Sequence, residues 1–80
     1  MYGKQYKLVK SFGSMYIKLS VCDALVISED GYKVDYTIID MENNQPSPII
    51  YANSSYAKAI RNRAYDILKD LENKGFIKEI

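Results

Sequence analysis

The sequence contains no histidine and no tryptophan, and Cys22 is its only cysteine. Histidine is the usual general base near neutral pH, so its absence removes most hydrolytic catalytic constellations. A single cysteine cannot form an internal disulfide, and without histidine or a second thiol the common zinc sites cannot be built. We therefore expect a protein that is not an enzyme, that binds no metal or cofactor, and that resides in a reducing compartment.

Glycine and long apolar runs are also scarce. The four glycines stand singly, so the chain has no glycine-rich phosphate-binding loop. The acidic residues match no calcium-binding loop, although Asp23, Glu29, Asp30 and Asp35 form a loose cluster in sequence. No apolar stretch approaches the roughly 20 residues of a membrane span, and no apolar signal segment follows residues 1–4. These absences predict a cytoplasmic location without membrane association, in the host cytoplasm if a virus encodes the protein.

The length and composition of the chain are those of one folded domain. The chain has 80 residues, of which 48% are hydrophobic and 26% charged. A chain of this length can build one core, and a small core leaves a thin stability margin that self-association often supplements. We expect a single domain over residues 1–80, with a homodimer as one way to extend its core.

Apolar and polar residues alternate along the first half of the chain, which is typical of half-buried strands. The pattern predicts strands over residues 4–12, 15–27 and 32–40, the second of them interrupted at Cys22-Asp23. Gly13-Ser14 predicts a two-residue hairpin turn between the first two strands, and residues 28–31 predict another turn with Gly31 at positive φ. The alternation breaks at Cys22-Asp23, which favours a bulge in one long strand over a turn between two strands.

The second half of the chain predicts a loop, a helix and a short tail. Two prolines mark residues 41–48 as a surface loop, after which Ile49-Ile50-Tyr51 could add a short edge strand. Apolar residues at helical spacing predict a helix over residues 54–74, ended by Gly75. Residues 76–80 form a tail or a short edge strand. The expected fold class is α+β: an antiparallel β-meander of three to five strands, within residues 4–51, packed against one C-terminal α-helix.

Charge is unevenly distributed although the net charge is only +1. Residues 1–22 hold four lysines and no acidic residue, whereas residues 23–50 hold six acidic residues and one lysine. The eight tyrosines outnumber the two phenylalanines, and tyrosine is enriched in binding surfaces. These features indicate a protein that binds a partner, with an acidic region and a basic region on its surface.

The first functional hypothesis is a small binding protein that masks a surface of another protein. Small proteins rich in lysine, tyrosine and isoleucine resemble inhibitors and accessory products of phages, other viruses or mobile elements. The acidic hairpin would then imitate nucleic-acid phosphates and occupy a basic groove. The residues expected to contact the partner are Glu29, Asp30, Tyr32, Asp35, Tyr36 and Asp40.

Two alternatives remain open. In one, the N-terminal hairpin binds nucleic acid, with lysines on phosphates and tyrosines stacked on bases. The residues expected to do this are Lys4, Tyr6, Lys7, Lys10, Tyr16 and Lys18. In the other, the protein is a structural homo-oligomer whose open sheet edge, near Ile49-Ile50-Tyr51 or Phe76-Ile77, pairs with a second copy.

Overall fold

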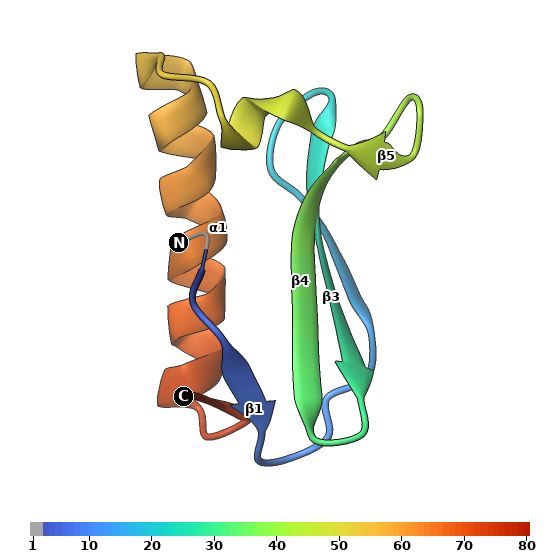
Figure 1. Cartoon of the computed structure of the whole chain (residues 1–80), viewed down its shortest axis with the longest axis vertical. Coiled ribbons are helices and arrows are strands. Elements are labelled where there is room, and N and C mark those ends of the chain that lie inside the picture. Colours follow the sequence, from blue (N-terminus) through green and yellow to red (C-terminus); the bar gives the residue numbers. More distant parts are fainter. Residues whose placement is uncertain (1–2) are drawn as a thin grey trace.

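The computed structural model describes residues 3–80, so the expectation drawn from Met1 and Tyr2 at the start of the chain lies outside it. An antiparallel sheet of six strands packs against one C-terminal helix, which confirms the predicted α+β class with more strands than expected (Figure 1). The elements are β1 (Tyr6–Leu8), β2 (Met15–Lys18), β3 (Asp23–Asp30), β4 (Lys33–Asp40), β5 (Gln45–Pro46), the 3₁₀ turn η1 (Pro48–Ile50), α1 (Ser55–Asn73) and β6 (Ile77–Glu79).

The strand order is β2-β3-β4-β1-β6, and β5 pairs with the end of β4. The hairpin predicted between the first two strands is therefore wrong. β1 lies between β4 and β6, with Tyr6 opposite Val34 and Leu8 opposite Ile77, while β2 is at the far edge beside β3. Gly13 has the expected positive φ of 77°, but the loop around it crosses the end of the sheet instead of folding β2 back onto β1.

The second and third turns differ from the prediction in smaller ways. Residues 19–22 form a turn between β2 and β3, not a bulge, because the amides of Leu19 and Ser20 both donate to the carbonyl of Asp23. The turn between β3 and β4 contains Gly31, as expected, with φ of 64°. Asp30 pairs with Lys33, so the strand continues past Glu29 and the turn itself is Gly31-Tyr32.

The region around the two prolines also departs from the expectation. Gln45–Pro46 forms the short strand, and Ile49-Ile50-Tyr51 does not. The hydroxyl of Ser47 accepts a hydrogen bond from the Ile49 amide, and Pro48 occupies the start of the turn, where its fixed φ is favourable. These local interactions place Ile49 in a 3₁₀ turn that leads into α1.

α1 lies close to its predicted bounds because both of its ends carry clear signals. Ser54 caps the first turn by accepting a hydrogen bond from the Ala57 amide at 3.1 Å. At the other end Gly75 has φ of 84°, and the amide of Phe76 donates to the carbonyl of Leu71, the pattern of a Schellman ending. The chain then turns directly into β6 at the sheet edge.

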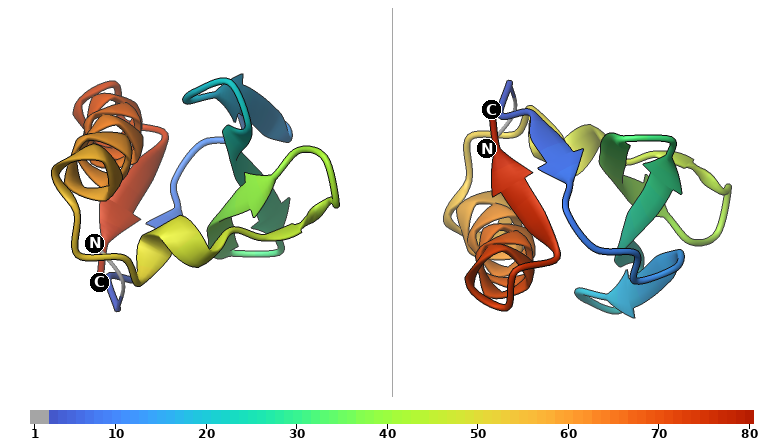
Figure 2. Two further views of the ribbon diagram at one scale, coloured as in Figure 1. Left: turned by 90° about the horizontal axis from the view of Figure 1, so that it is seen from above. Right: turned by 90° about the horizontal axis from the view of Figure 1, so that it is seen from below.

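The sheet curves around its core, and α1 covers the concave face (Figure 2). The side chains that lie deepest come from both layers: Leu25, Ile27, Ile38, Leu68 and Ile77. Alternation along the strands places the intervening residues on the convex face, where solvent reaches most of them, although Ala24 and Ile39 are buried. Within residues 3–80, no helix has the length and apolar character needed to cross a membrane.

Candidate functional site

The six residues predicted to contact a partner do not form one acidic surface. The Glu29 carboxylate accepts hydrogen bonds from the Ser11 hydroxyl and from the amides of Phe12 and Gly13. The Asp40 carboxylate accepts bonds from the Glu42 amide and the Asn43 side chain. Both carboxylates thus stabilise loops of the protein itself, which reduces their capacity to imitate phosphates.

Hydrogen bonding also changes the electrostatics of Glu29. The amide of Phe12, followed by that of Gly13 and the hydroxyl of Ser11, holds the pKa of the Glu29 carboxyl below its ordinary value, against a smaller effect of burial. The charged form is therefore favoured by the fold. Its role in the structure is to fasten the crossing loop, residues 9–14, to the end of β3.

The other predicted contact residues lie in different surroundings. Tyr36 is half-buried, and its hydroxyl donates a 2.8 Å bond to the Lys4 carbonyl. Asp30 and Asp35 are exposed and lie beside Lys33 on β3 and β4. Tyr32, in the turn, is 88% exposed. Of the predicted partner surface, the freely exposed part is therefore the tip of this one hairpin.

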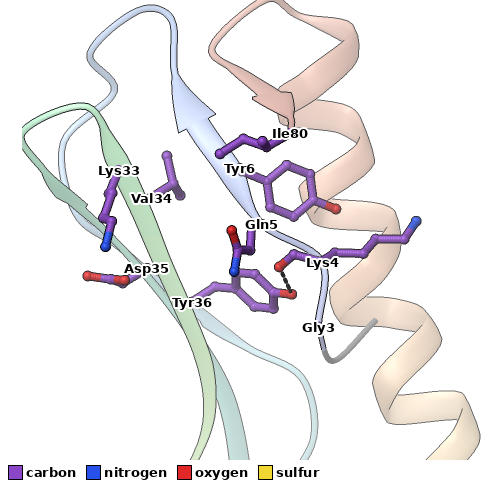
Figure 3. A pocket seen from close by; sticks show the side chains of 9 residues that line it. All are labelled: Gly3, Lys4, Gln5, Tyr6, Lys33, Val34, Asp35, Tyr36 and Ile80. Carbon is purple, nitrogen blue, oxygen red and sulfur yellow. Dashed lines mark hydrogen bonds between the residues drawn. The ribbon is translucent and has the colours of Figure 1, made fainter.

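A pocket of about 350 Å³ opens where β1 diverges from β4 (Figure 3). Tyr6 and Tyr36 meet edge to face there, with ring centroids 5.8 Å apart. Burial raises the pKa of both phenols, so both remain protonated at neutral pH and neither can serve as a base. The two tyrosines therefore contribute ring surface and hydroxyl hydrogen bonds to this pocket.

Lys4 closes the pocket toward the helix and is already engaged. Its ammonium lies 3.6 Å from Glu79 and 4.3 Å from the centre of the Tyr65 ring. Hydrogen bonding to Tyr65, more than the charge of Glu79, raises the pKa of Lys4. Lys4 thus ties β1 to β6 and α1, and it is poorly placed to contact a phosphate.

The remaining residues of the predicted nucleic-acid surface separate in the structure. Tyr6 is buried, at 4% exposure, so its ring cannot stack on a base. Lys10 lies over the Phe76 ring at 5.3 Å. Tyr16 and Lys18 are exposed on β2, at the edge of the sheet away from β1. Lys7 instead joins two lysines from other parts of the chain.

These three lysines form a row across adjacent strands. The register places Lys7 of β1 directly opposite Lys33 of β4 on one side and Lys78 of β6 on the other. Each lysine is next to a buried core residue, namely Tyr6, Val34 and Ile77 respectively, so all three lie on the convex face, and all three are exposed. None of them makes an ion pair with any residue of the 3–80 region. We call Lys7, Lys33 and Lys78 the lysine row.

On the other side of the molecule, an apolar groove of about 770 Å³ separates β2 from α1. Its floor is formed by apolar side chains from both elements and from the segments that flank them. These are Phe12, Met15, Ile17, Ile67, Leu71 and Phe76, all but the buried Leu71 partly exposed. The groove is therefore a region where the core is incompletely covered.

The wall of this groove on the sheet side is the free edge of β2. The amide of Leu19 donates a hydrogen bond to the carbonyl of Asp23, so Leu19 directs its backbone groups toward β3. In an antiparallel pair every second residue does this, so the amides and carbonyls of Met15 and Ile17 also point toward β3. The amides and carbonyls of Tyr16 and Lys18 must then point away from β3. Within the described residues, no strand lies on that side of β2.

The rim of the groove carries charge of both signs. Lys18 from β2 and Arg63 from α1 contribute positive charge, and neither makes an ion pair with a residue in the described range. Asp70 is paired with Lys74 at 2.9 Å nearer the C-terminal end of α1. Asp66, three positions after Arg63 on α1, also lines the groove without an ion pair to a described residue, so the charges of Lys18, Arg63 and Asp66 leave a small positive excess there.

No protein-family model matches this chain, and the comparisons with curated proteins and with solved structures gave no match either.

Asp23, part of the acidic set considered for a cation, is buried among hydrogen-bond donors. Its carboxylate accepts a 2.7 Å bond from the Ser47 hydroxyl and a 3.1 Å bond from the Ser20 hydroxyl. Within residues 3–80, no three His, Cys, Asp or Glu side chains gather as metal ligands would. Cys22 is exposed next to Asp23, with its sulfur 3.9 Å from the carboxylate.

The sequence pattern did not single out Lys33, Lys78 or the apolar residues of the groove. The signal for the lysine row was present, because each lysine occupies a polar position in an alternating segment. What was missing was the order of the strands, which brings residues 7, 33 and 78 together. The groove depended on knowing that β2 is an edge strand and that α1 faces it.

Proposed function

We propose that this protein is a non-catalytic binding protein that holds an extended segment of another protein between β2 and α1, and so masks that segment. The observation that carries the proposal is the outward-facing backbone of Tyr16 and Lys18 beside an apolar groove. A partner strand could extend the sheet by hydrogen bonding to this edge, while alternate side chains enter the groove. Main-chain bonds would supply affinity, and the groove would supply selectivity.

The chemistry of the groove defines the segment that fits it. Its apolar floor favours apolar residues at every second position, since successive side chains of a strand point to opposite faces. Lys18 and Arg63 make no ion pair with a described residue and outnumber the nearby Asp66, so an acidic residue of the segment placed beside Lys18 would complement the rim. The expected occupant is thus an extended apolar segment with a carboxylate near one end.

The edge can be tested by removing one outward amide. Proline at position 18 removes the Lys18 amide hydrogen, which points away from β3, so the β2–β3 ladder can remain intact. Lys18→Gln is the matched control because it removes the same charge and keeps the amide. Random peptides displayed on phage should be selected on the wild-type protein, and a synthetic copy of a selected peptide titrated into all three proteins.

The expected selection converges on peptides with apolar residues at alternate positions and an acidic residue near one end. Binding should shift the amide resonances of Tyr16 and Lys18 in the wild-type protein. Lys18→Pro should weaken the peptide at least tenfold, while Lys18→Gln should lose only the smaller contribution of one charge. Selected peptides that bind elsewhere, equal losses in both variants, or a selection without convergence would contradict the proposal.

A second copy of the chain is a competing occupant of the same edge. Gel filtration of the wild-type protein and of Lys18→Pro, each at two protein concentrations, distinguishes self-pairing from a monomer. Concentration-dependent dimerisation that Lys18→Pro abolishes would show that β2 pairs with itself and would overturn the proposal of a foreign segment. A monomer at both concentrations is the expected result.

A further inference from the structure

We infer that the lysine row on the convex face is a second binding site, which takes the phosphodiester backbone of a single-stranded nucleic acid. This site lies on the face of the sheet opposite α1 and is independent of the proposed groove. Its three lysines come from β1, β4 and β6, which are consecutive in the sheet.

The first argument is the unfavourable arrangement of the row itself. Residues directly opposite each other on neighbouring strands have Cβ atoms about 5 Å apart, and like charges in such positions destabilise a sheet. Lys7 faces a lysine on both sides. No ion pair among residues 3–80 relieves the repulsion between these lysines. Binding of an external polyanion would neutralise their charges and would explain why the sheet contains this unfavourable arrangement.

Acidic residues on the convex face offset the charge of the row only at its β4 end. Asp30 is opposite Lys33, so it lies at one end of the row, on β3. Asp35 follows two positions after Lys33 on β4, to one side of the row. Glu79 follows Lys78 in β6 and therefore lies on the opposite, concave face of the sheet, where its carboxylate is paired with the ammonium of Lys4 at 3.6 Å. Lys33 is therefore flanked by two carboxylates, whereas Lys7 and Lys78 have no acidic residue directly opposite them on a neighbouring strand.

The dimensions of the row suit a strand of phosphates. Neighbouring strands lie about 4.8 Å apart, so the row extends for roughly 10 Å. Three lysines spread over this length can contact on the order of three successive phosphates of one strand. A polyanion laid across the strands thus meets a lysine on each.

Tyr32 favours single-stranded nucleic acid over other polyanions. It lies in the β3–β4 turn, beyond the ends of both strands, and at 88% exposure its ring projects into solvent there instead of packing beside the buried Val34. An unpaired base beside the backbone can stack on such a ring, whereas a base inside a duplex cannot, and anionic lipid headgroups offer no ring to stack. The ligand class that uses both the lysines and this tyrosine is therefore an unpaired strand.

The test is fluorescence anisotropy of a labelled, mixed-sequence single-stranded oligonucleotide at several salt concentrations. The double variant Lys7→Gln with Lys33→Gln removes two charges from the row. Lys58→Gln with Lys69→Gln removes two charges from the exposed side of α1 and is the matched control. Far-UV circular dichroism establishes that both variants fold, and Lys7→Gln should not lower the melting temperature because it relieves repulsion.

Three contacts predict a slope of about −2 for log affinity against log salt, at about −0.7 per phosphate on a single strand. The row variant should reduce that slope to about −0.7 and lower the affinity at low salt by on the order of tenfold. The α1 control should change both quantities little. Salt-independent binding, equal losses in both variants or no binding at low salt would overturn the inference.

Two further arms identify the polyanion. Tyr32→Ser should weaken the oligonucleotide by roughly fivefold or more and leave inorganic polyphosphate unaffected, because only the former provides bases to stack. Vesicles containing phosphatidylserine should bind more weakly than the oligonucleotide. Vesicle binding through the row without oligonucleotide binding, or tighter binding of duplex than of single strand, would contradict the assignment to an unpaired strand.

Discussion

Asp23 and Ser47 are joined by a buried hydrogen bond of 2.7 Å, across 24 positions of the chain. The bond fastens the start of β3 to the segment that leads into η1. Both residues are almost fully buried, at 5% and 4% exposure, so the bond is shielded from solvent.

Asp23→Ala should lower the free energy of unfolding by about 1–3 kcal/mol, because it leaves the buried Ser47 hydroxyl without its acceptor. Asp23→Asn retains one acceptor oxygen and should cost less. Urea denaturation of the two variants measures the difference. If both variants unfolded at the wild-type midpoint, this bond would contribute nothing to stability.

Glu29 should make the protein less stable in acid. Its pKa is lowered in the folded state, chiefly by the amide of Phe12, so its stabilising effect is fully present above the pKa of an unfolded glutamate, about 4.3. The effect is lost as the pH falls from there through the lowered folded pKa. Denaturation across this range should show a stability decrease that is smaller in Glu29→Gln. An identical pH profile in both proteins would refute the role assigned to this carboxylate.

Gly75 should be intolerant of a side chain because it adopts φ of 84° at the end of α1. Gly75→Ala should cost about 1–2 kcal/mol through strain of the left-handed backbone, not through a clash, since no atom lies within 4 Å of an added Cβ. Gly75→Asn should cost less, because asparagine tolerates this conformation better. Thermal unfolding of the pair checks the order; equal melting temperatures would contradict it.

Arg61 should hold the segment before α1 in place. Its guanidinium donates bonds to the carbonyls of Ile49 at 3.1 Å and Ala52 at 2.6 Å. Arg61→Met removes both bonds and should make residues 48–54 more sensitive to limited proteolysis, with a loss of about 1–3 kcal/mol in stability. Arg63→Met, two positions on, is the control, because Arg63 makes no such bond among the described residues. Equal cleavage rates in the two variants would argue against the role.

The features that could be predicted from the sequence are those whose causes are local. The helix followed from its apolar spacing, and its ends from Ser54 and Gly75, which act within one turn of their own position. Gly31 marked the β3–β4 turn because the turn geometry depends on that residue. The α+β class followed from these local patterns together.

The features that could not be predicted depend on pairing between distant segments. Gly13-Ser14 has the composition of a hairpin turn, which predicted that β1 and β2 pair with each other. In the structure β1 pairs with β4 and β6 instead, and β2 lies at the far edge of the sheet. Glu29 looked available to a partner because its hydrogen-bond donors lie 16 to 18 positions earlier in the chain. Tyr6 looked like a surface ring because the strand face that α1 covers was not known.

The pairing of β1 with β6 also has a consequence for how the chain is synthesised. Gln5 accepts a hydrogen bond from the amide of Ile80, so the first and last described strands are neighbours in space. A ribosome must therefore have extruded residues 77–80 before this part of the sheet can close, and closure joins segments separated by nearly the whole described chain. Until then β1 can pair on one side only, and its other edge is exposed to whatever binds nascent chains.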